Sequence, residues 1–164
     1  THALSIVGQE QDISTGVRNT EALAEAISGV FADTYRLMFK THAYHWNVEG
    51  PMFVSVHNLP EEQYQHLFAA ADDLAERIRA LGKMAPTTLT SIVEKSVVED
   101  HDGILSAGEM CKDLAADHER VAHRLHALIK IAGENNDPVT EDMATERSAF
   151  HEKAAWMLRA LSAD

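Results

Sequence analysis

Imidazole and carboxylate side chains occur in two groups in the first half of this sequence. The first group is His45, His57 and Glu61, and the second is Asp72 and Glu76. Nitrogen and oxygen donors of this kind bind Fe(II), and a chain with one cysteine has no thiolate cluster for a structural zinc. The last two residues of the first group are spaced i, i+4, as are the two of the second, so each pair lies on one helix face. Each group is therefore a candidate half of a metal site.

A single helix cannot bring the two groups together. Glu61 and Asp72 are eleven residues apart, which is roughly 16 Å along a helix axis. Because the ligands of one metal lie within a few Å of it, each half needs a partner from elsewhere. A second copy of the chain, running antiparallel, would supply it. The spacing therefore predicts a metal site at a subunit interface.

Both groups also have an interpretation without a metal. A lone histidine on the inward face of a helix, such as His45, is more often a hydrogen-bonded core residue than a ligand. Asp72 and Glu76 could equally be an acidic surface pair beside Arg77. The occurrence of both i, i+4 pairs on one helix, preceded by His45-Trp46 at a tight loop, favours the metal interpretation.

Composition limits the classes of partner. The 164 residues suffice for one domain, and 26 acidic against 14 basic side chains give a net charge of -12. This charge repels nucleic-acid phosphates, and it indicates either a solvated acidic surface or one that gathers cations. Cys111 has no partner for an intrachain disulfide, and we find neither a signal-like start nor an apolar run long enough to span a membrane. We expect a cytoplasmic protein without membrane contact.

Apolar residues recur every three or four positions in four segments, which predicts four long helices and no strand. The predicted helices cover residues 19–45, 58–82, 102–131 and 139–164, with a short helix at 91–97. Asn19 and Asn58 are the expected N-caps, and Pro60 would then fall in a tolerated first turn. We expect an arm at 1–18 and an all-α four-helix bundle at 19–164, with the ferritin-like long connection between its second and third helices.

A di-iron site inside such a bundle carries Glu-x-x-His on two helices. None of the ten histidines has a glutamate three residues earlier. This absence strengthens the prediction of a site between subunits.

One continuous segment carries a family resemblance. Residues 45–53 read HWNVEGPMF, His57-x-x-x-Glu61 follows, and residues 72–82 read DDLAERIRALG. This pattern resembles the signature of the Dps family, the miniferritins. The resemblance is dense from about residue 41 to 82, and the helix layout agrees over nearly the whole chain after Asn19.

The resemblance implies a hollow homo-dodecamer that acts as a ferroxidase. Its centres, with two iron ions each, would lie at two-fold interfaces, where His45, His57 and Glu61 of one subunit meet Asp72 and Glu76 of another. They would oxidise Fe(II) with hydrogen peroxide, or more slowly with oxygen, and Fe(III) would be stored as a mineral core. Many members have Asp where this chain has Glu61, and the longer side chain could alter the metal spacing.

Further residues have both a functional and a structural interpretation. Trp46 would lie beside the metals, as an electron donor or as a packing residue. Four acids gather at the start of the last predicted helix, where they either complement the helix dipole or line an ion entry pore: Asp137, Glu141, Asp142 and Glu146.

Two competing functions have to be distinguished from iron storage. One is a DNA-compacting protein with a secondary iron site, but residues 1–18 contain only Arg18 as a basic side chain and the last five residues contain none. Since phosphate neutralisation supplies most DNA affinity, we expect little or no direct binding. The other is a structural helical oligomer whose histidines and acids only form interface ion pairs.

Overall fold

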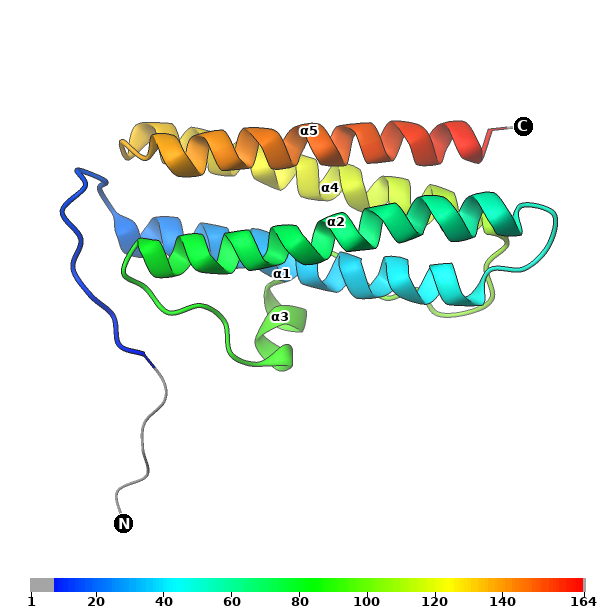
Figure 1. Ribbon diagram of the computed structural model, residues 1–164, viewed down its shortest axis with the longest axis horizontal. Coiled ribbons are helices and arrows are strands. Elements are labelled where there is room, and N and C mark those ends of the chain that lie inside the picture. The colour runs from blue at the N-terminus through cyan, green and yellow to red at the C-terminus, as the bar shows by residue number, and fades with distance from the viewer. Residues whose placement is uncertain (1–7, 164) are drawn as a thin grey trace, which may run out of the picture.

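The computed structural model describes residues 8–163, and within that range it contains five helices and no strand. Their bounds are α1 Thr20–Asn47, α2 Phe53–Ala80, α3 Leu89–Lys95, α4 Ala107–Glu134 and α5 Pro138–Leu161. The four long helices lie along one axis, with α1 and α2 forming one antiparallel hairpin and α4 and α5 another (Figure 1). The connection from α2 to α4 returns along the bundle, so these two helices run in the same direction. The predicted four-helix bundle with a longer second connection is confirmed.

The inward faces of the helices carry the apolar stripes that the sequence predicts. Each long helix contributes fully buried side chains of similar size, among them Leu23, Leu37, Leu67, Leu114 and Leu158. Burying each such side chain contributes about 1.5–3 kcal/mol. This packing, more than intrinsic helix propensity, holds the helices in register.

The start of α2 differs from the prediction. The helix begins at Phe53, directly after the Gly50 turn, whose φ of 100° suits glycine. Asn58 is therefore not an N-cap but an interior residue, and Pro60 lies inside the helix. Because proline has no N–H, Pro60 cannot donate to the carbonyl of Val56 one turn earlier, yet the helix continues through it. His57 and Glu61 thus share one continuous helix.

Other helix ends differ by a few residues. Asn19 precedes α1 as predicted, but its φ is 51° and its side chain makes no capping bond. α4 begins at Ala107 instead of residue 102, because Ser106 and Glu109 form a reciprocal capping box. It ends at Glu134 instead of residue 131. The short helix α3 was predicted about two residues too late, and Thr88 caps it.

Residues 8–18 form no helix and follow the outside of the bundle. Gln11 N–H donates to the Gly82 carbonyl at 2.8 Å, and Arg18 N–H donates to the Asn135 carbonyl at 2.9 Å. These two backbone hydrogen bonds hold the described part of the predicted arm against the bundle. Residues 1–7 of the predicted arm lie outside the described residues. Among the described helices, none is long and apolar enough to cross a membrane.

Candidate metal centre

His45 and His57 meet where the last turn of α1 lies against the first turns of α2. Their rings are stacked, with centroids 3.8 Å apart and an angle of 15° between the planes. His45 Nδ1 lies 2.6 Å from the carbonyl oxygen of His57, and His57 Nδ1 lies 2.8 Å from the carbonyl oxygen of His45. The tight turn at Gly50 makes this reciprocal contact possible.

These two hydrogen bonds fix which nitrogen of each ring carries a proton. A carbonyl oxygen only accepts, so each Nδ1 carries the proton and donates. In a neutral imidazole the other nitrogen, Nε2, then keeps its lone pair, which is the form that binds a metal. His45 is 7% exposed and His57 is partly exposed. The two rings thus lie together, His45 buried and His57 partly exposed, and each has a nitrogen that could bind a metal.

Glu61 is the third predicted ligand of the histidine half. It follows His57 by one turn of α2 and is partly buried. Because residues spaced i, i+4 lie on the same helix face, its carboxylate is on the side of α2 that carries His57. The ligand atoms of these three residues do not all lie within 4.8 Å of one another in the described chain, as those of the acidic group do, so Glu61 as a third ligand beside the two histidines stays a prediction.

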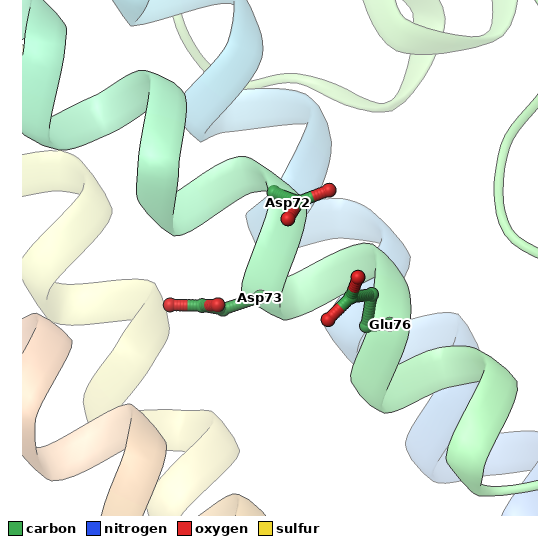
Figure 2. A group of neighbouring side chains, drawn as sticks. All are labelled: Asp72, Asp73 and Glu76. Atoms are coloured by element: carbon green, nitrogen blue, oxygen red, sulfur yellow. The ribbon is translucent and has the colours of Figure 1, made fainter.

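The acidic half lies further along α2 and contains one more residue than predicted. Asp72, Asp73 and Glu76 are all exposed, and each offers an oxygen within 4.8 Å of the others. Figure 2 shows Asp72 and Asp73 leaving the helix in different directions, with Asp73 turned toward the ribbons of α4 and α5. Asp73 was missed because neighbouring residues on a helix face different sides. Its i, i+3 spacing to Glu76 is the signal that would have found it.

The structure keeps the two halves apart within one chain. Both lie on the continuous helix α2, and the eleven residues from Glu61 to Asp72 correspond to roughly 16 Å. No group within the described residues combines histidines from the first half with acids from the second. Within the described residues the two predicted halves are thus separate, and their completion by a second copy of the chain stays a prediction.

Trp46 lies in a row of aromatic rings next to the histidine half. Its ring is 3.8 Å from that of His42, which stacks at 4.1 Å on Tyr64. Tyr64 in turn contacts His45 edge to face at 5.2 Å. Trp46 is 54% exposed, so the indole covers the rings beside a predicted ligand without being part of the core.

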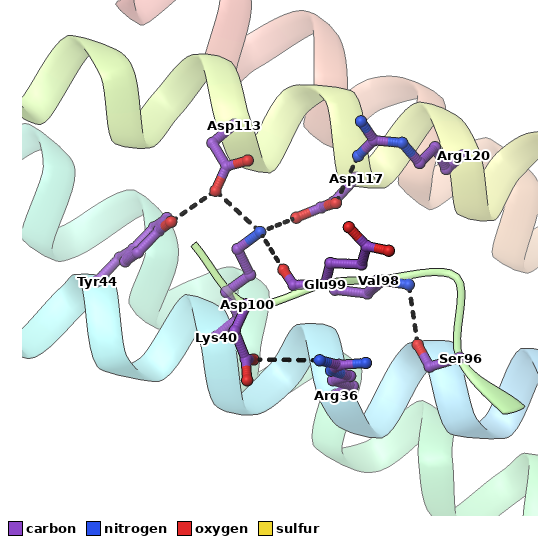
Figure 3. Close-up of polar contacts among 10 residues, drawn as sticks. All are labelled: Arg36, Lys40, Tyr44, Ser96, Val98, Glu99, Asp100, Asp113, Asp117 and Arg120. Carbon is purple, nitrogen blue, oxygen red and sulfur yellow. Dashed lines mark hydrogen bonds and ion pairs between the residues drawn. The ribbon is translucent and has the colours of Figure 1, made fainter. Parts of the chain in front are cut away.

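A buried ionic network holds the end of α1 that carries His45. Lys40 Nζ lies 2.7 Å from Asp117 and 2.9 Å from Asp113, and it donates to the Glu99 carbonyl at 2.8 Å (Figure 3). The phenol of Tyr44 donates to Asp113, and burial together with this bond raises its pKa. The network ties α1 to α4 and to the α3–α4 connection. The positive charge at the centre of the network is that of Lys40.

The predicted pore acids have different environments. Asp137 is fully buried, accepts from the Thr140 N–H as N-cap of α5, and lies 2.7 Å from Arg77. Its carboxylate therefore stabilises the start of α5 and the contact of α5 with α2. Asp142 and Glu146 are exposed and line a cavity of about 340 Å³ with Asp73. Glu141 is partly exposed, and the assignment of these four acids to an entry pore stays a prediction.

The comparisons with known proteins agree with this geometry. The family described as a ferritin-like domain matches residues 8–164. The chain is 35% identical over 124 residues to the DNA protection during starvation protein of Brevibacillus brevis, covering 76% of this chain and 83% of the relative. It is 32% identical over 137 residues to the protein of the same name from Helicobacter pylori, covering 83% and 95%. The crystal structure of Dps from Staphylococcus aureus superposes with a TM-score of 0.85 at 32% identity, covering 88% of this chain and 97% of that one.

The fold defines a class of protein, the ferritin-like helix bundles, and this bundle carries nitrogen and carboxylate donors. The chain belongs to the ferritin-like family, in its Dps branch. This membership associates it with iron storage and protection against oxidative stress.

Proposed function

We propose that this protein is a ferroxidase and iron store whose catalytic centres form between subunits. In this proposal His45, His57 and Glu61 of one subunit and Asp72 and Glu76 of a second copy hold two Fe(II) ions as substrate. The observation that carries the proposal is the reciprocal Nδ1–carbonyl pairing of His45 and His57, since it leaves both Nε2 atoms as metal donors.

The division of the site between subunits agrees with its charge. The histidine half contributes two neutral rings and one carboxylate, and the acidic half contributes two or three carboxylates. Together they neutralise most of the charge of two Fe(II) ions. Asp73 is a further candidate oxygen donor, because its carboxylate is within reach of both other acids.

The proposed reaction takes one electron from each of two Fe(II) ions. One hydrogen peroxide accepts both electrons, its O–O bond breaks, and its oxygens leave as water or hydroxide. A paired two-electron step avoids the one-electron reduction that would release hydroxyl radical. Fe(III) then hydrolyses, releases protons and is stored as mineral, and the indole of Trp46 is placed to give up an electron if a radical does form.

Large apolar side chains that a single subunit exposes support the proposal that subunits assemble. On α1 and α2 alone, Phe39, Trp46, Val54 and Phe68 are more than half exposed. Covering such side chains with a second subunit would remove apolar area from water, which favours association. We propose a closed homo-oligomer, a dodecamer by family resemblance, in which these surfaces are covered.

The proposal is tested with purified protein, Fe(II) and hydrogen peroxide under anaerobic conditions. We expect ferric absorbance to appear at one peroxide consumed per two Fe(II), with no trapped hydroxyl radical. Light scattering on the same sample should give a mass of about twelve subunits. Slow oxidation at the rate of Fe(II) in buffer would contradict the proposal and would favour the purely structural oligomer.

The alternative of a DNA-compacting protein rests on the names of the relatives. The net charge of -12 and the single basic side chain within residues 1–18 oppose it. We therefore propose that any protection of DNA comes from removal of Fe(II) and peroxide.

A further inference from the structure

A cluster of buried polar side chains lies where the two helix hairpins meet, away from both halves of the metal centre. His118 on α4 and His151 on α5 are fully buried, and their Nδ1 atoms are 2.8 Å apart. Arg147 on α5 is also buried and donates from Nη1 to Nδ1 of His66 on α2, again at 2.8 Å. The second bond joins the α4–α5 hairpin to the α1–α2 hairpin.

One aromatic ring connects the two bonds. Phe150 stacks on His66 with centroids 4.0 Å apart, and its edge faces His118 at 6.0 Å. The Arg147 guanidinium lies 4.6 Å from the same ring. Three of the chain's ten histidines are thus gathered around a single phenylalanine in the interface between hairpins.

Both hydrogen bonds require unprotonated imidazole. A guanidinium only donates, so Nδ1 of His66 must accept with a lone pair. In the bond between His118 and His151 one Nδ1 donates and the other must likewise accept. If His66 takes up a proton, its bond to Arg147 is lost and two cations face each other. If both buried rings are protonated, their shared bond is lost as well.

We propose that His66, Arg147, His118 and His151 form an acid-sensitive latch that releases the α4–α5 hairpin from α2 when the solution becomes mildly acidic. His66 is exposed at the rim, so a proton reaches it first. The inference concerns the bundle of one subunit and does not rest on the iron chemistry.

Burial and the surrounding charges both act on the histidines of this cluster. Burial and the nearby Arg147 lower the pKa of His118 to about 3, and they lower the pKa of His151 and of His66. Glu146 on α5 acts in the opposite direction on His66, and Glu146 and Asp73 act to raise the pKa of Arg147, which burial lowers. The cavities beside His66 are also lined by Asp142 and Lys153 of α5 and Glu62 of α2. Because the folded-state pKa values are depressed, the stabilisation is complete above the ordinary histidine pKa of 6.5 and is lost as the pH falls below it.

Hydrogen exchange measured by mass spectrometry on the assembled protein tests the latch. Exchange is measured at about pH 8 and about pH 5.5, which lie on either side of the ordinary histidine pKa. The rates are then corrected for the intrinsic pH dependence of exchange. We expect protection of the α5 amides around 143–158 to fall about ten-fold more than that of α1. Equal changes in α1 and α5, or no change, would overturn the proposal.

A matched pair of variants separates the latch from general acid unfolding. In His66→Asn the amide oxygen takes the place of Nδ1 and accepts from Arg147 without titrating, so α5 should lose clearly less protection at the lower pH, and the loss that remains comes from His118 and His151. His123→Asn replaces an exposed histidine on α4 and should behave as the unmodified protein does. Loss of α5 protection in His66→Asn equal to that in the unmodified protein would show that His66 is not the trigger.

Discussion

The carbonyl groups of His45 and His57 determine which nitrogen of each imidazole is available to a metal. The sequence indicated that both rings could be ligands, but it could not indicate their tautomers, because the two accepting carbonyls come from the opposite helix of the hairpin. The i, i+4 spacing places Glu61 on the same helix face as His57, and its role as a ligand stays a prediction. The same spacing rule missed Asp73, whose carboxylate comes near that of Glu76 through an i, i+3 spacing.

His57→Ala should slow iron oxidation by on the order of a hundred-fold or more, because it removes one nitrogen donor and the ring that stacks on His45. His57 also gives His45 its only observed Nδ1 contact through its backbone, which the variant keeps. Stopped-flow absorbance after mixing with Fe(II) and peroxide measures the rate. His126→Ala, which changes an exposed histidine on α4, is the control and should leave the rate unchanged. Equal rates in both variants would remove His57 from the site.

At the scale of helices, α5 depends on Asp137. This carboxylate caps the helix and neutralises Arg77 of α2, and it is fully buried. Asp137→Ala should therefore lower the free energy of unfolding by about 2–4 kcal/mol, since a cap and a buried ion pair are both lost. Denaturant unfolding followed by circular dichroism measures the change.

The exposed acid on the same helix gives a matched control. Asp142→Ala should leave unfolding unchanged, and if the acids of α5 form an entry path it should slow iron uptake. A small effect of Asp137→Ala on unfolding would contradict the structural assignment and return Asp137 to the predicted pore.

Lys40 has a comparable role between α1 and α4. Lys40→Met keeps the length of the side chain but leaves Asp117 buried with Arg120 as its remaining partner. Burial raises the pKa of Asp117 against the attraction of Lys40, so the variant should lose about 3 kcal/mol near neutral pH and less when Asp117 is protonated. Unfolding at several pH values measures this; a loss that is independent of pH would attribute the effect to packing.

The helices were predictable to different degrees, for physical reasons. Apolar periodicity predicted every long helix, because burial of one face is a local property of the sequence. The predicted start of α2 was wrong. The prediction placed Pro60 in a first turn, whereas tertiary packing keeps the helix continuous through this residue. The partners of Asp137 and Lys40 could not be predicted, since Arg77 and Asp117 are distant in sequence and only the folded bundle brings them together.

For the whole molecule, the charge predicts how the protein meets DNA. A net charge of -12 on each subunit multiplies across an oligomer, and at about 0.01 M salt the Debye length is about 30 Å, so repulsion reaches far from the surface. We expect no binding of linear duplex DNA at low or high salt without divalent metal, measured by gel shift. Tight binding at low salt that weakens log-linearly with added salt would reveal a basic surface and favour the compaction function.

The division of one centre between two subunits is the central claim, and mixed assemblies test it directly. Shells of His57→Ala alone and of Asp72→Ala alone should oxidise Fe(II) slowly, since every centre lacks a ligand. When dissociated subunits of the two variants are mixed equally and reassembled, about a quarter of the centres should pair an intact histidine half with an intact acidic half across a two-fold interface. Iron oxidation in the mixed shells should then recover to about a quarter of the rate of the unmodified protein. A mixture no faster than either parent shell, with reassembly verified by light scattering, would contradict the account.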